Sequence, residues 1–441
     1  MKFISTRDIN QLYPVNLREA VIKGLADDGG LFMPSAISLI SKDELEKMPS
    51  MPLPEIASLV LGRFLGEAIK KERLENICNE VFNFLVPLVE IEKNVFSLEL
   101  FHGPTLAFKD VGARFMSRLM GSFSLDSSKE IKVVVATSGD TGSAVAAGFH
   151  GVKGIEVFIL FPKGKVSRMQ EKQLTTWGGN ITAIEVEGVF DDCQKHVKSL
   201  LADEKLKEST LLTSANSINI ARLLPQAVYY AYAWSRLQHL EKPLVISVPS
   251  GNFGNLTAGL LAQKIGIPIH HFIASTNVND VVPSYLNDGK FLPRPSEQTV
   301  SNAMDVGNPS NFERMLHLFH NNHQSMKQSI TGYHFNDTET KNAISEIAEK
   351  TSYIVDPHGA VGYLGLKQFI LNNHFEMTGV FLETAHPAKF PEAVEESLGK
   401  KILVPERLSA FEEKASFSIP CANDYEAVKD ILMRTKAASP R

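Results

Sequence analysis

Residues 131–149 read I-K-V-V-V-A-T-S-G-D-T-G-S-A-V-A-A-G-F, and this stretch contains the unit from which the fold is predicted. The run at 131–136 is apolar except for Lys132, as in a strand buried on both faces, and a Gly/Ser/Thr loop leads from it to a helical run at 144–149. Strand and helix patterns then alternate: strands at 155–161, 181–186, 245–248, 272–274 and 380–382, helices at 166–177 and 191–206. This alternation predicts an α/β fold with open, mostly parallel sheets covered on both sides.

The composition excludes several classes of protein. The chain has 441 residues, 22% charged residues and a net charge of -5, so nothing in the charge balance indicates a nucleic-acid partner. Cys78, Cys193 and Cys421 are far apart and form no CxxC pair, which predicts a reducing compartment, by default the cytoplasm, and neither disulfides nor a zinc site. The N-terminus shows no apolar leader, and no uninterrupted apolar run approaches 18 residues, so we expect neither export nor a membrane span.

Two glycine-rich loops follow buried strands and precede helices. The first reads TSGDTGS at 137–143, and the second reads PSGNFGN at 249–255. Backbone N–H groups at such a helix N-terminus attract phosphates and carboxylates. Neither loop matches GxGxxG or GxxxxGK[ST], so a dinucleotide or a nucleoside triphosphate receives little support. A single loop of this kind could simply cap its helix, but two of them predict a ligand with two anionic ends.

One lysine lies in unusual surroundings. In HGPTLAFKD at 102–110, Lys109 follows a mostly apolar segment, and a helical run begins just after it. Apolar neighbours disfavour the ammonium form of a lysine, and the free amine can then act as a nucleophile or base, as in a Schiff base. The alternative is a lysine that extends its charged end to solvent from a partly buried helix start.

Three weaker patterns receive a structural interpretation. His317, His320 and His323 recur every three residues on a probable helix, but no acidic residue completes a metal-ligand set, so we expect a solvated helix face and no metal. Small residues at 359, 362 and 365 lie within a helical run, where they favour close helix packing. His386 has no G-x-S-x-G serine as a hydrolase partner.

Several motifs together carry a family resemblance. HGPTLAFKD at 102–110, TSGDTGSA at 137–144, PSGNFGN at 249–255 and ETAHPAKF at 383–390 resemble the threonine synthase family, pyridoxal-phosphate (PLP) enzymes of the tryptophan synthase β-like, fold type II class. Supporting stretches include GLADDGGLFMP at 24–34, NSINIAR at 216–222 and AMDVGNPSNFER at 303–314. The resemblance covers residues 5 to about 400 in the family's order.

The resemblance implies a role for each matching residue. Lys109 would carry the cofactor as an internal aldimine and afterwards move protons on the substrate, and Thr384 would face the pyridine nitrogen. Asp140 would lie near the cofactor's phenolic oxygen and share a proton with it. The cofactor phosphate would bind to Gly251, Asn252, Phe253, Gly254 and Asn255. The substrate carboxylate would bind to Ser138, Gly139, Asp140, Thr141 and Gly142. The leaving phosphate would bind to Lys163, Arg168, Asn216 and Arg222.

The implied reaction converts O-phospho-L-homoserine and water to L-threonine and phosphate, by loss of the γ-phosphate and addition of water at Cβ. One alternative is a PLP-dependent phospholyase that releases a keto product and ammonia from another phosphorylated amino compound. Another is a non-catalytic protein that binds a phosphorylated metabolite. The resemblance leaves the oligomeric state open, monomer or homodimer.

The expected architecture follows the same family. We expect an N-terminal domain over 1–95, a large PLP-binding domain formed by 96–110 and 236–400, and a smaller mobile α/β domain over 111–235. The cofactor would lie between the two α/β domains. Residues 401–441 would form a helical tail with a short disordered end at 436–441.

Overall fold

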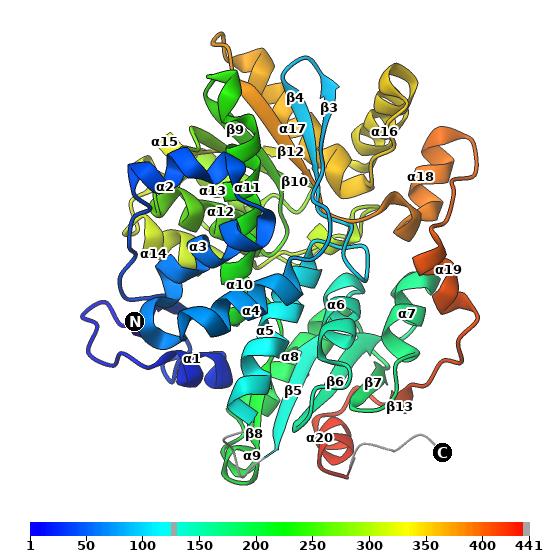
Figure 1. Ribbon diagram of the computed structural model, residues 1–441. Coiled ribbons are helices and arrows are strands. Elements are labelled where there is room, and N and C mark those ends of the chain that lie inside the picture. Colours follow the sequence, from blue (N-terminus) through cyan, green and yellow to red (C-terminus); the bar gives the residue numbers. More distant parts are fainter. Residues whose placement is uncertain (125–129, 435–441) are drawn as a thin grey trace. The chain divides into compact units, whose positions relative to one another are not determined.

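The computed structural model describes residues 1–124 and 130–434 (Figure 1). The chain divides into two compact units. Unit 1 comprises Met1, Met33–Phe108 and Leu223–Leu403, and unit 2 comprises Lys2–Phe32, Lys109–Arg222 and the described part of Val404–Arg441. The functional domains expected from the sequence stay a prediction, and the expected disordered end at 436–441 lies outside the described residues.

Unit 1 contains a six-stranded sheet with the order β11-β10-β9-β12-β4-β3. All neighbours are parallel except β3 and β4, which pair antiparallel. Because the central strands run in one direction, the chain leaves β9 and β12 at the same edge of the sheet. The strands are β3 (Leu88–Glu92), β4 (Val95–Glu99), β9 (Leu244–Pro249), β10 (His271–Thr276), β11 (Ile330–His334) and β12 (Thr378–Glu383).

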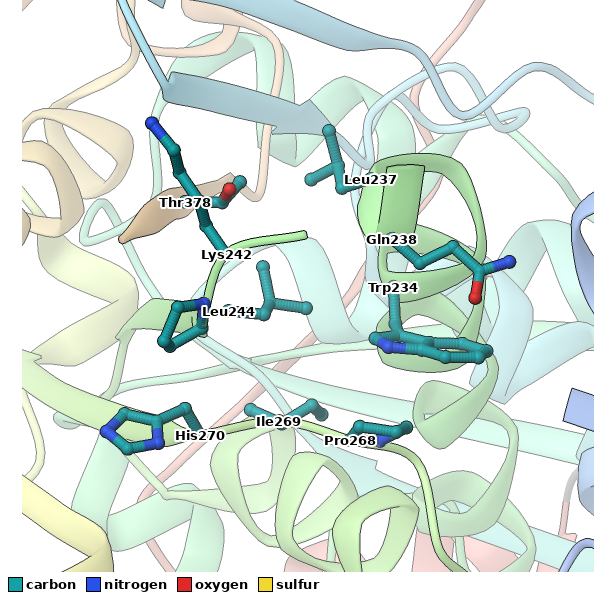
Figure 2. Close-up of a pocket in the computed structure, with 10 residues that line it drawn as sticks. Trp234, Leu237, Gln238, Lys242, Leu244, Pro268, Ile269, His270 and Thr378 are labelled. Atoms are coloured by element: carbon teal, nitrogen blue, oxygen red, sulfur yellow. The ribbon is translucent and has the colours of Figure 1, made fainter. Parts of the chain in front are cut away.

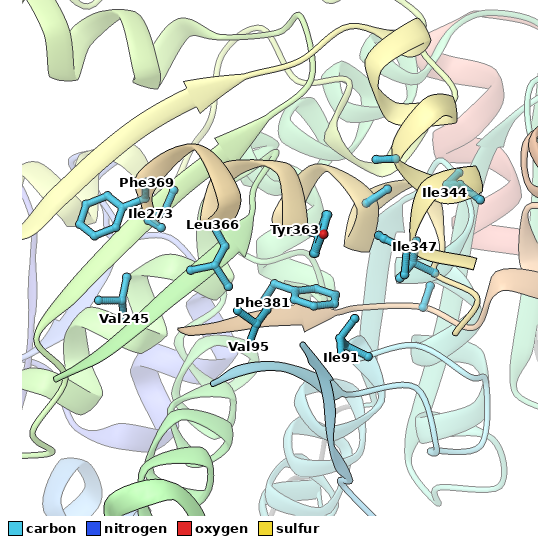
Figure 3. Packing of buried hydrophobic residues seen from close by; sticks show 14 of the residues in the cluster. Ile91, Val95, Val245, Ile273, Ile344, Ile347, Tyr363, Leu366, Phe369 and Phe381 are labelled. Carbon is cyan, nitrogen blue, oxygen red and sulfur yellow. The ribbon is translucent and has the colours of Figure 1, made fainter. Parts of the chain in front are cut away.

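The helices of unit 1 pack on this sheet and on one another. Figure 3 shows that Leu366 and Phe369 of α17 face the sheet that carries Val245, Ile273 and Phe381, and all five belong to one cluster of buried hydrophobic residues. Burial of these side chains supplies the main stabilisation of this face. The helices are α2 (Lys42–Lys47), α3 (Leu53–Leu65), α4 (Lys71–Val81), α11 (Ala227–Leu237), α12 (Gly254–Lys264), α13 (Val281–Asp288), α14 (Phe312–Leu318), α15 (His323–Ser329), α16 (Asp337–Thr351), α17 (Pro357–Asn372) and α18 (Pro391–Leu398).

Unit 2 contains a five-stranded, fully parallel sheet with the order β13-β7-β6-β5-β8. Helices α6 and α7 contact the strands on one side, and α8, backed by α20, contacts them on the other. The strands are β5 (Ile131–Ala136), β6 (Ile155–Pro162), β7 (Ile181–Val186), β8 (Leu211–Ser214) and β13 (Ile419–Cys421). The helices are α1 (Leu17–Lys23), α5 (Lys109–Ser124), α6 (Asp140–Phe149), α7 (Arg168–Thr175), α8 (Phe190–Ala202), α9 (Glu204–Ser209), α19 (Glu406–Glu412) and α20 (Tyr425–Arg434), and α10 (Ile220–Leu223) begins in this unit.

The predicted strands are confirmed, but the helix predictions for 144–149 and 191–206 need correction. The helix expected over 191–206 is two helices, because Asp203 ends α8 and its side chain accepts a hydrogen bond from the Leu206 N–H to cap α9. The helix expected from 144 begins at Asp140, within the segment 137–143 that was predicted to be a loop. Near the N-terminus, the short strands β1 (Phe3–Ser5) and β2 (Phe32–Pro34) form a separate two-stranded sheet. No helix in the two described ranges has the length and hydropathy needed to cross a bilayer.

Candidate active site

Lys109 is the first residue of α5, and its side chain is half-buried. The residues directly before Lys109 are hydrogen-bonded to the residues that follow β12. Residues Ala107 and Ala385 form an isolated antiparallel bridge, and the Phe108 N–H donates to the Thr384 carbonyl at 2.9 Å. Thr384 therefore lies against the residue that immediately precedes Lys109 in the chain.

The loop between β9 and α12 is held by close backbone contact. Phe253, the N-cap of α12, has a left-handed backbone (φ 58°) and gives the helix no side-chain cap. A Cβ at Gly251 would lie 2.7 Å from Met304 Cα and 2.8 Å from the Ala303 carbonyl oxygen. Because both contacts are to backbone, only glycine fits at 251. The Ser310 N–H donates to Asn252 Oδ1 at 2.6 Å and anchors the loop from another side.

This loop presents hydrogen-bond donors that the protein does not use. Across the described ranges, the backbone N–H groups of Gly251, Phe253, Gly254 and Asn255 have no recorded acceptor. The Asn255 side chain is 6% exposed, and its Oδ1 accepts from the Tyr230 hydroxyl at 2.8 Å. Its buried Nδ2 has no hydrogen-bond partner among the residues that the structure describes. An unpaired buried donor costs about 1–3 kcal/mol. These donors at a helix N-terminus fit a phosphate.

Thr384 follows β12 and is buried, and within the part of the chain that the structure describes its hydroxyl makes no hydrogen bond. Glu383, directly before it, is fully buried. Burial, and next the negative charge of Asp356, raise the pKa of the Glu383 carboxyl well above its usual range. The Glu383 carboxyl therefore keeps its proton to a higher pH than an ordinary glutamic acid does. A polar, unpartnered hydroxyl at 384 fits the position expected beside a pyridine nitrogen.

The other glycine-rich loop, predicted at 137–143, lies in unit 2 and runs from the end of β5 into the first turn of α6. The Thr137 hydroxyl accepts hydrogen bonds from the N–H groups of Gly139 at 2.9 Å and Gly142 at 2.8 Å. Gly139 has φ 140°, and a Cβ there would lie 2.3 Å from Gln170 Cδ. Asp140 is buried, and its Oδ1 accepts from Gln170 Nε2 at 3.1 Å. The side chains of Ser138 and Thr141 are half-buried.

The four residues predicted for the leaving phosphate divide into two kinds. Lys163 and Arg168 are exposed, and Lys163 pairs with Glu187 at 3.4 Å. Asn216 instead joins β5 to β8, because it accepts from the Ala136 N–H and donates to the Ala136 carbonyl. Arg222 is 2% exposed and donates to the Ala215 carbonyl. Burial lowers the Arg222 pKa to about 10, although the Asp110 charge opposes this shift.

The structure locates the weaker sequence patterns, namely the spaced histidines, the small residues at 359, 362 and 365, and His386. His317 lies in α14 and His323 begins α15, so the prediction of a single helix is wrong. In the described ranges, no group of three or more metal-ligating side chains is arranged to hold an ion. The close-packing interpretation of the small residues in α17 is confirmed, because a Cβ at Gly365 would lie 1.9 Å from Ser275 Oγ. His386 accepts from the Ala388 N–H and caps a short 3-10 helix.

A pocket of about 520 Å³ lies in unit 1, and Figure 2 shows the residues that line it. It is lined by Leu244, His270 and Thr378 at the starts of β9, β10 and β12, together with Trp234 and Lys242. The candidate residues follow the opposite ends of β9 and β12. The pocket is therefore separate from the candidate site.

Comparison with known proteins finds matches to related families over nearly the whole chain. Residues 85–380 match the family described as "Pyridoxal-phosphate dependent enzyme". Residues 2–82 match "Threonine synthase N terminus", and residues 359–432 match "Threonine synthase, C-terminal". The threonine synthase of Escherichia coli K12 is 42% identical over 434 residues, which cover 98% of this chain and 99% of the relative.

Solved structures agree with the sequence matches. The crystal structure of threonine synthase from E. coli superposes with a TM-score of 0.92 at 41% identity and covers 99% of this chain and 100% of that chain. The structure of PLP-bound threonine synthase from Brucella melitensis has a TM-score of 0.91 at 33% identity and covers 98% of both chains.

These matches define the chain as a PLP-dependent enzyme of fold type II, with two mostly parallel open sheets and an N-terminal segment. Within that class, the chain belongs to the threonine synthase family, and its function is that of a PLP-dependent lyase of threonine biosynthesis. The family, fold class and cofactor predicted from the sequence are confirmed. The sequence analysis missed the buried group formed by Asp356, His358 and Glu383. A helix-start signal, the Asp-Pro pair at 356–357, was its only visible sign.

Proposed function

We propose that the enzyme converts O-phospho-L-homoserine and water to L-threonine and phosphate, with Lys109 as the amine that binds the cofactor and moves protons on the substrate. The observation that carries this proposal is the hydrogen bond between Phe108 and Thr384, which holds the segment next to the lysine against the residue proposed for the pyridine nitrogen. A hydroxyl at 384, unlike a carboxylate, does not hold the ring protonated.

The remaining cofactor contacts are proposed from the unused donors. Gly251, Asn252, Phe253, Gly254 and Asn255 would bind the cofactor phosphate, supported by the free N–H groups and the orphan amide of Asn255. Bound PLP supplies the electron sink that lets the substrate lose protons from Cα and Cβ and release its γ-phosphate. Asp140 would share a proton with the cofactor's phenolic oxygen, with its carboxylate oriented by Gln170.

The substrate contacts follow from which groups the protein already uses. Ser138, Gly139, Asp140, Thr141 and Gly142 remain the proposed carboxylate loop. Because Thr137 engages both glycine N–H groups, Ser138 and Thr141 are the donors that we propose for the carboxylate.

For the leaving phosphate we propose the two exposed cations. Lys163 and Arg168 can reach a ligand from the surface, whereas Asn216 and Arg222 support the loops from their buried positions. Arginine binds phosphate through several donors at once, so Arg168 should contribute most.

We also propose a cytoplasmic location and a small-molecule substrate without a nucleic-acid partner. Two observations support this part of the proposal. Cys78, Cys193 and Cys421 are free and buried, as expected in a reducing compartment. The net charge of -5 disfavours a polyanion as partner.

The test combines product analysis with a chemical mark on the lysine. With added PLP and O-phospho-L-homoserine, the protein should release threonine and phosphate in equal amounts. Borohydride reduction followed by peptide mass spectrometry should place the pyridoxyl group on Lys109. Lys109→Ala should lose both results, whereas Lys341→Ala, which removes a half-buried lysine paired with Glu396, should lose neither. A keto acid with ammonia in place of threonine would identify a phospholyase.

A further inference from the structure

His358 is the second residue of α17 and is 2% exposed. Its ring is bonded at both nitrogens. The Ala303 N–H donates to Nε2 at 3.2 Å, and Nδ1 lies 2.5 Å from Asp356 Oδ1. Because a backbone N–H can only donate, Nε2 must be the acceptor, and the ring proton is then on Nδ1, which donates to Asp356. The imidazole is thus a neutral bridge of fixed tautomer between two segments.

On its Nε2 side, His358 is connected through Ala303 to the loop at 251–255. Ala303 belongs to the 3-10 helix Asn302–Met304, and the backbone of this helix packs against Gly251. The Ala303 carbonyl oxygen and the Met304 Cα would be within 2.8 Å of a Cβ at 251, so the two backbones are in direct contact. A shift of Ala303 would therefore displace the loop that carries the unused donors.

The aspartate end leads to Thr384. Asp356 is fully buried; its Oδ2 accepts from the Ala385 N–H at 3.2 Å, and its own N–H donates to Glu383 Oε1 at 2.6 Å. Asp356 thus holds the residues on both sides of Thr384. The Thr384 carbonyl is fixed from the other direction by the Phe108 N–H. The backbone that orients the Thr384 hydroxyl has little freedom left.

We propose that His358 and Asp356 are positioning residues that set the spacing between the loop at 251–255 and Thr384, and so hold the two ends of the cofactor in register. The proposal rests on the function proposed above, because it takes the loop as the phosphate site and Thr384 as the partner of the ring nitrogen. Neither residue needs to touch the cofactor. A chain of hydrogen bonds through fully buried groups is suited to this role, since it has no water to replace a lost partner.

The test measures cofactor binding and stability separately. His358→Phe keeps a ring of similar size and removes both hydrogen bonds. We expect it to raise the dissociation constant of PLP by about tenfold or more, because a displaced contact at a preorganised site loses much of its value. The dissociation constant is read by titrating PLP into the cofactor-depleted full-length chain and following tryptophan fluorescence. The rise in melting temperature on addition of PLP should shrink in parallel.

A second histidine provides the matched control. The His271 ring bonds Thr331 Oγ1 at 2.8 Å and stacks on Phe369, at the start of β10 and so at the opposite edge of the same sheet. His271→Phe should lower the melting temperature of the cofactor-free chain without changing the PLP dissociation constant. His358→Gln, which can still accept from Ala303 or donate to Asp356, should recover part of the affinity that His358→Phe loses.

Two further results decide the matter if His358→Phe folds poorly. Asp356→Asn keeps Oδ1 as an acceptor but offers the Ala385 N–H an amide, so it should weaken PLP binding as well. Wild-type affinity in Asp356→Asn, or a His358→Phe chain that loses stability but binds PLP normally, would overturn the proposal. Failure of the proposed function looks different, since the wild-type chain would then bind no PLP or carry it elsewhere than on Lys109.

Discussion

At the scale of single residues, Glu383 is the unusual group of the candidate site. Its carboxyl is buried beside Asp356, and a Cβ at Gly359 would lie only 1.4 Å from Glu383 Oε2. Within the described part of the chain, this oxygen has no hydrogen-bond partner. A neutral acid tolerates such a position far better than a carboxylate does. Glu383 therefore keeps its proton in the folded chain at pH values where an unfolded chain has released it.

This difference predicts a pH dependence of stability. The folded pKa of Glu383 lies above the ordinary value of 4.5, so the folded state binds more protons than the unfolded state from about pH 4.5 upward. Stability contributed by this group must then fall as the pH rises through that window. Glu383→Gln cannot titrate, and we expect urea unfolding of the variant to lose less stability than wild type between about pH 5 and about pH 8.

The control for this prediction is an exposed carboxylate. Glu396 is 66% exposed and pairs with Lys341 at 2.8 Å. Glu396→Gln should leave the pH profile of wild type unchanged, because solvent screens such a pair. If Glu383→Gln showed the same loss of stability with pH as wild type, Glu383 would have to be ionised in the folded chain.

At the scale of elements, α17 can lie close to its sheet because its inner face carries glycines. The glycines at 359, 362 and 365 meet Glu383, Pro249 and Ser275, which belong to β12, β9 and β10. Larger side chains would move the helix away from the strands whose ends carry the candidate site. The position of the N-terminus of α17, and with it Asp356 and His358, depends on this close packing.

A pair of glycine substitutions tests that statement. Gly359→Ala should lower the free energy of unfolding by about 1–3 kcal/mol, the usual cost of overpacking a core. Gly62→Ala is the matched control, because Gly62 lies inside α3 and a Cβ there meets nothing within 4 Å. It should stabilise the protein by up to about 1 kcal/mol through helix propensity. Denaturant unfolding of both variants measures the two free energies, and equal effects would contradict the packing argument.

The elements also show what the sequence could and could not predict. The buried strands and the two glycine-rich segments that follow them could be predicted from the sequence, since apolar runs and short motifs are local signals. The site roles of Lys109 and Thr384 stay predictions. The break of the helix at Asp203 was missed because one polar residue within an amphipathic run looks like an exposed helical position. Strand β13 was missed in a tail predicted to be helical, because three residues that include Pro420 give too short a pattern at a sheet edge.

The buried hydrogen bonds that support the candidate site could not be predicted from the sequence, for a different reason. Asp356, Ala303 and Ala385 are far apart in the sequence, and their hydrogen bonds depend on tertiary packing alone. A buried histidine such as His358 has no periodic or compositional signature. Its role appears only when both ring nitrogens have partners in three dimensions.

At the scale of the whole molecule, the C-terminal tail belongs to unit 2, although the segment before it, up to Leu403, belongs to unit 1. Strand β13 extends the sheet beyond β7, and Val428 and Leu432 of α20 are fully buried in the core that α8 covers. The buried Lys132 pairs with Glu156 at 3.0 Å and donates to the Leu432 carbonyl at 2.7 Å. The tail is thus a structural part of this sheet.

Removal of residues 404–441 should therefore affect the two units unequally. The deletion exposes the edge of β7 and the apolar surface under α20, and it leaves the Lys132 ammonium in unit 2 without one of its partners. An uncovered apolar face and a buried charge with a lost partner both destabilise a core, so amide hydrogens of β5, β6 and β7 should exchange much faster than in the full chain. Those of β9, β10 and β12 should keep their protection, because no residue of the tail belongs to unit 1.

Hydrogen exchange followed by mass spectrometry separates the two sets of strands in one experiment. Equal loss of protection in both sheets would mean that the two units unfold as one cooperative body, and unchanged protection in β7 would mean that the tail is dispensable for its sheet.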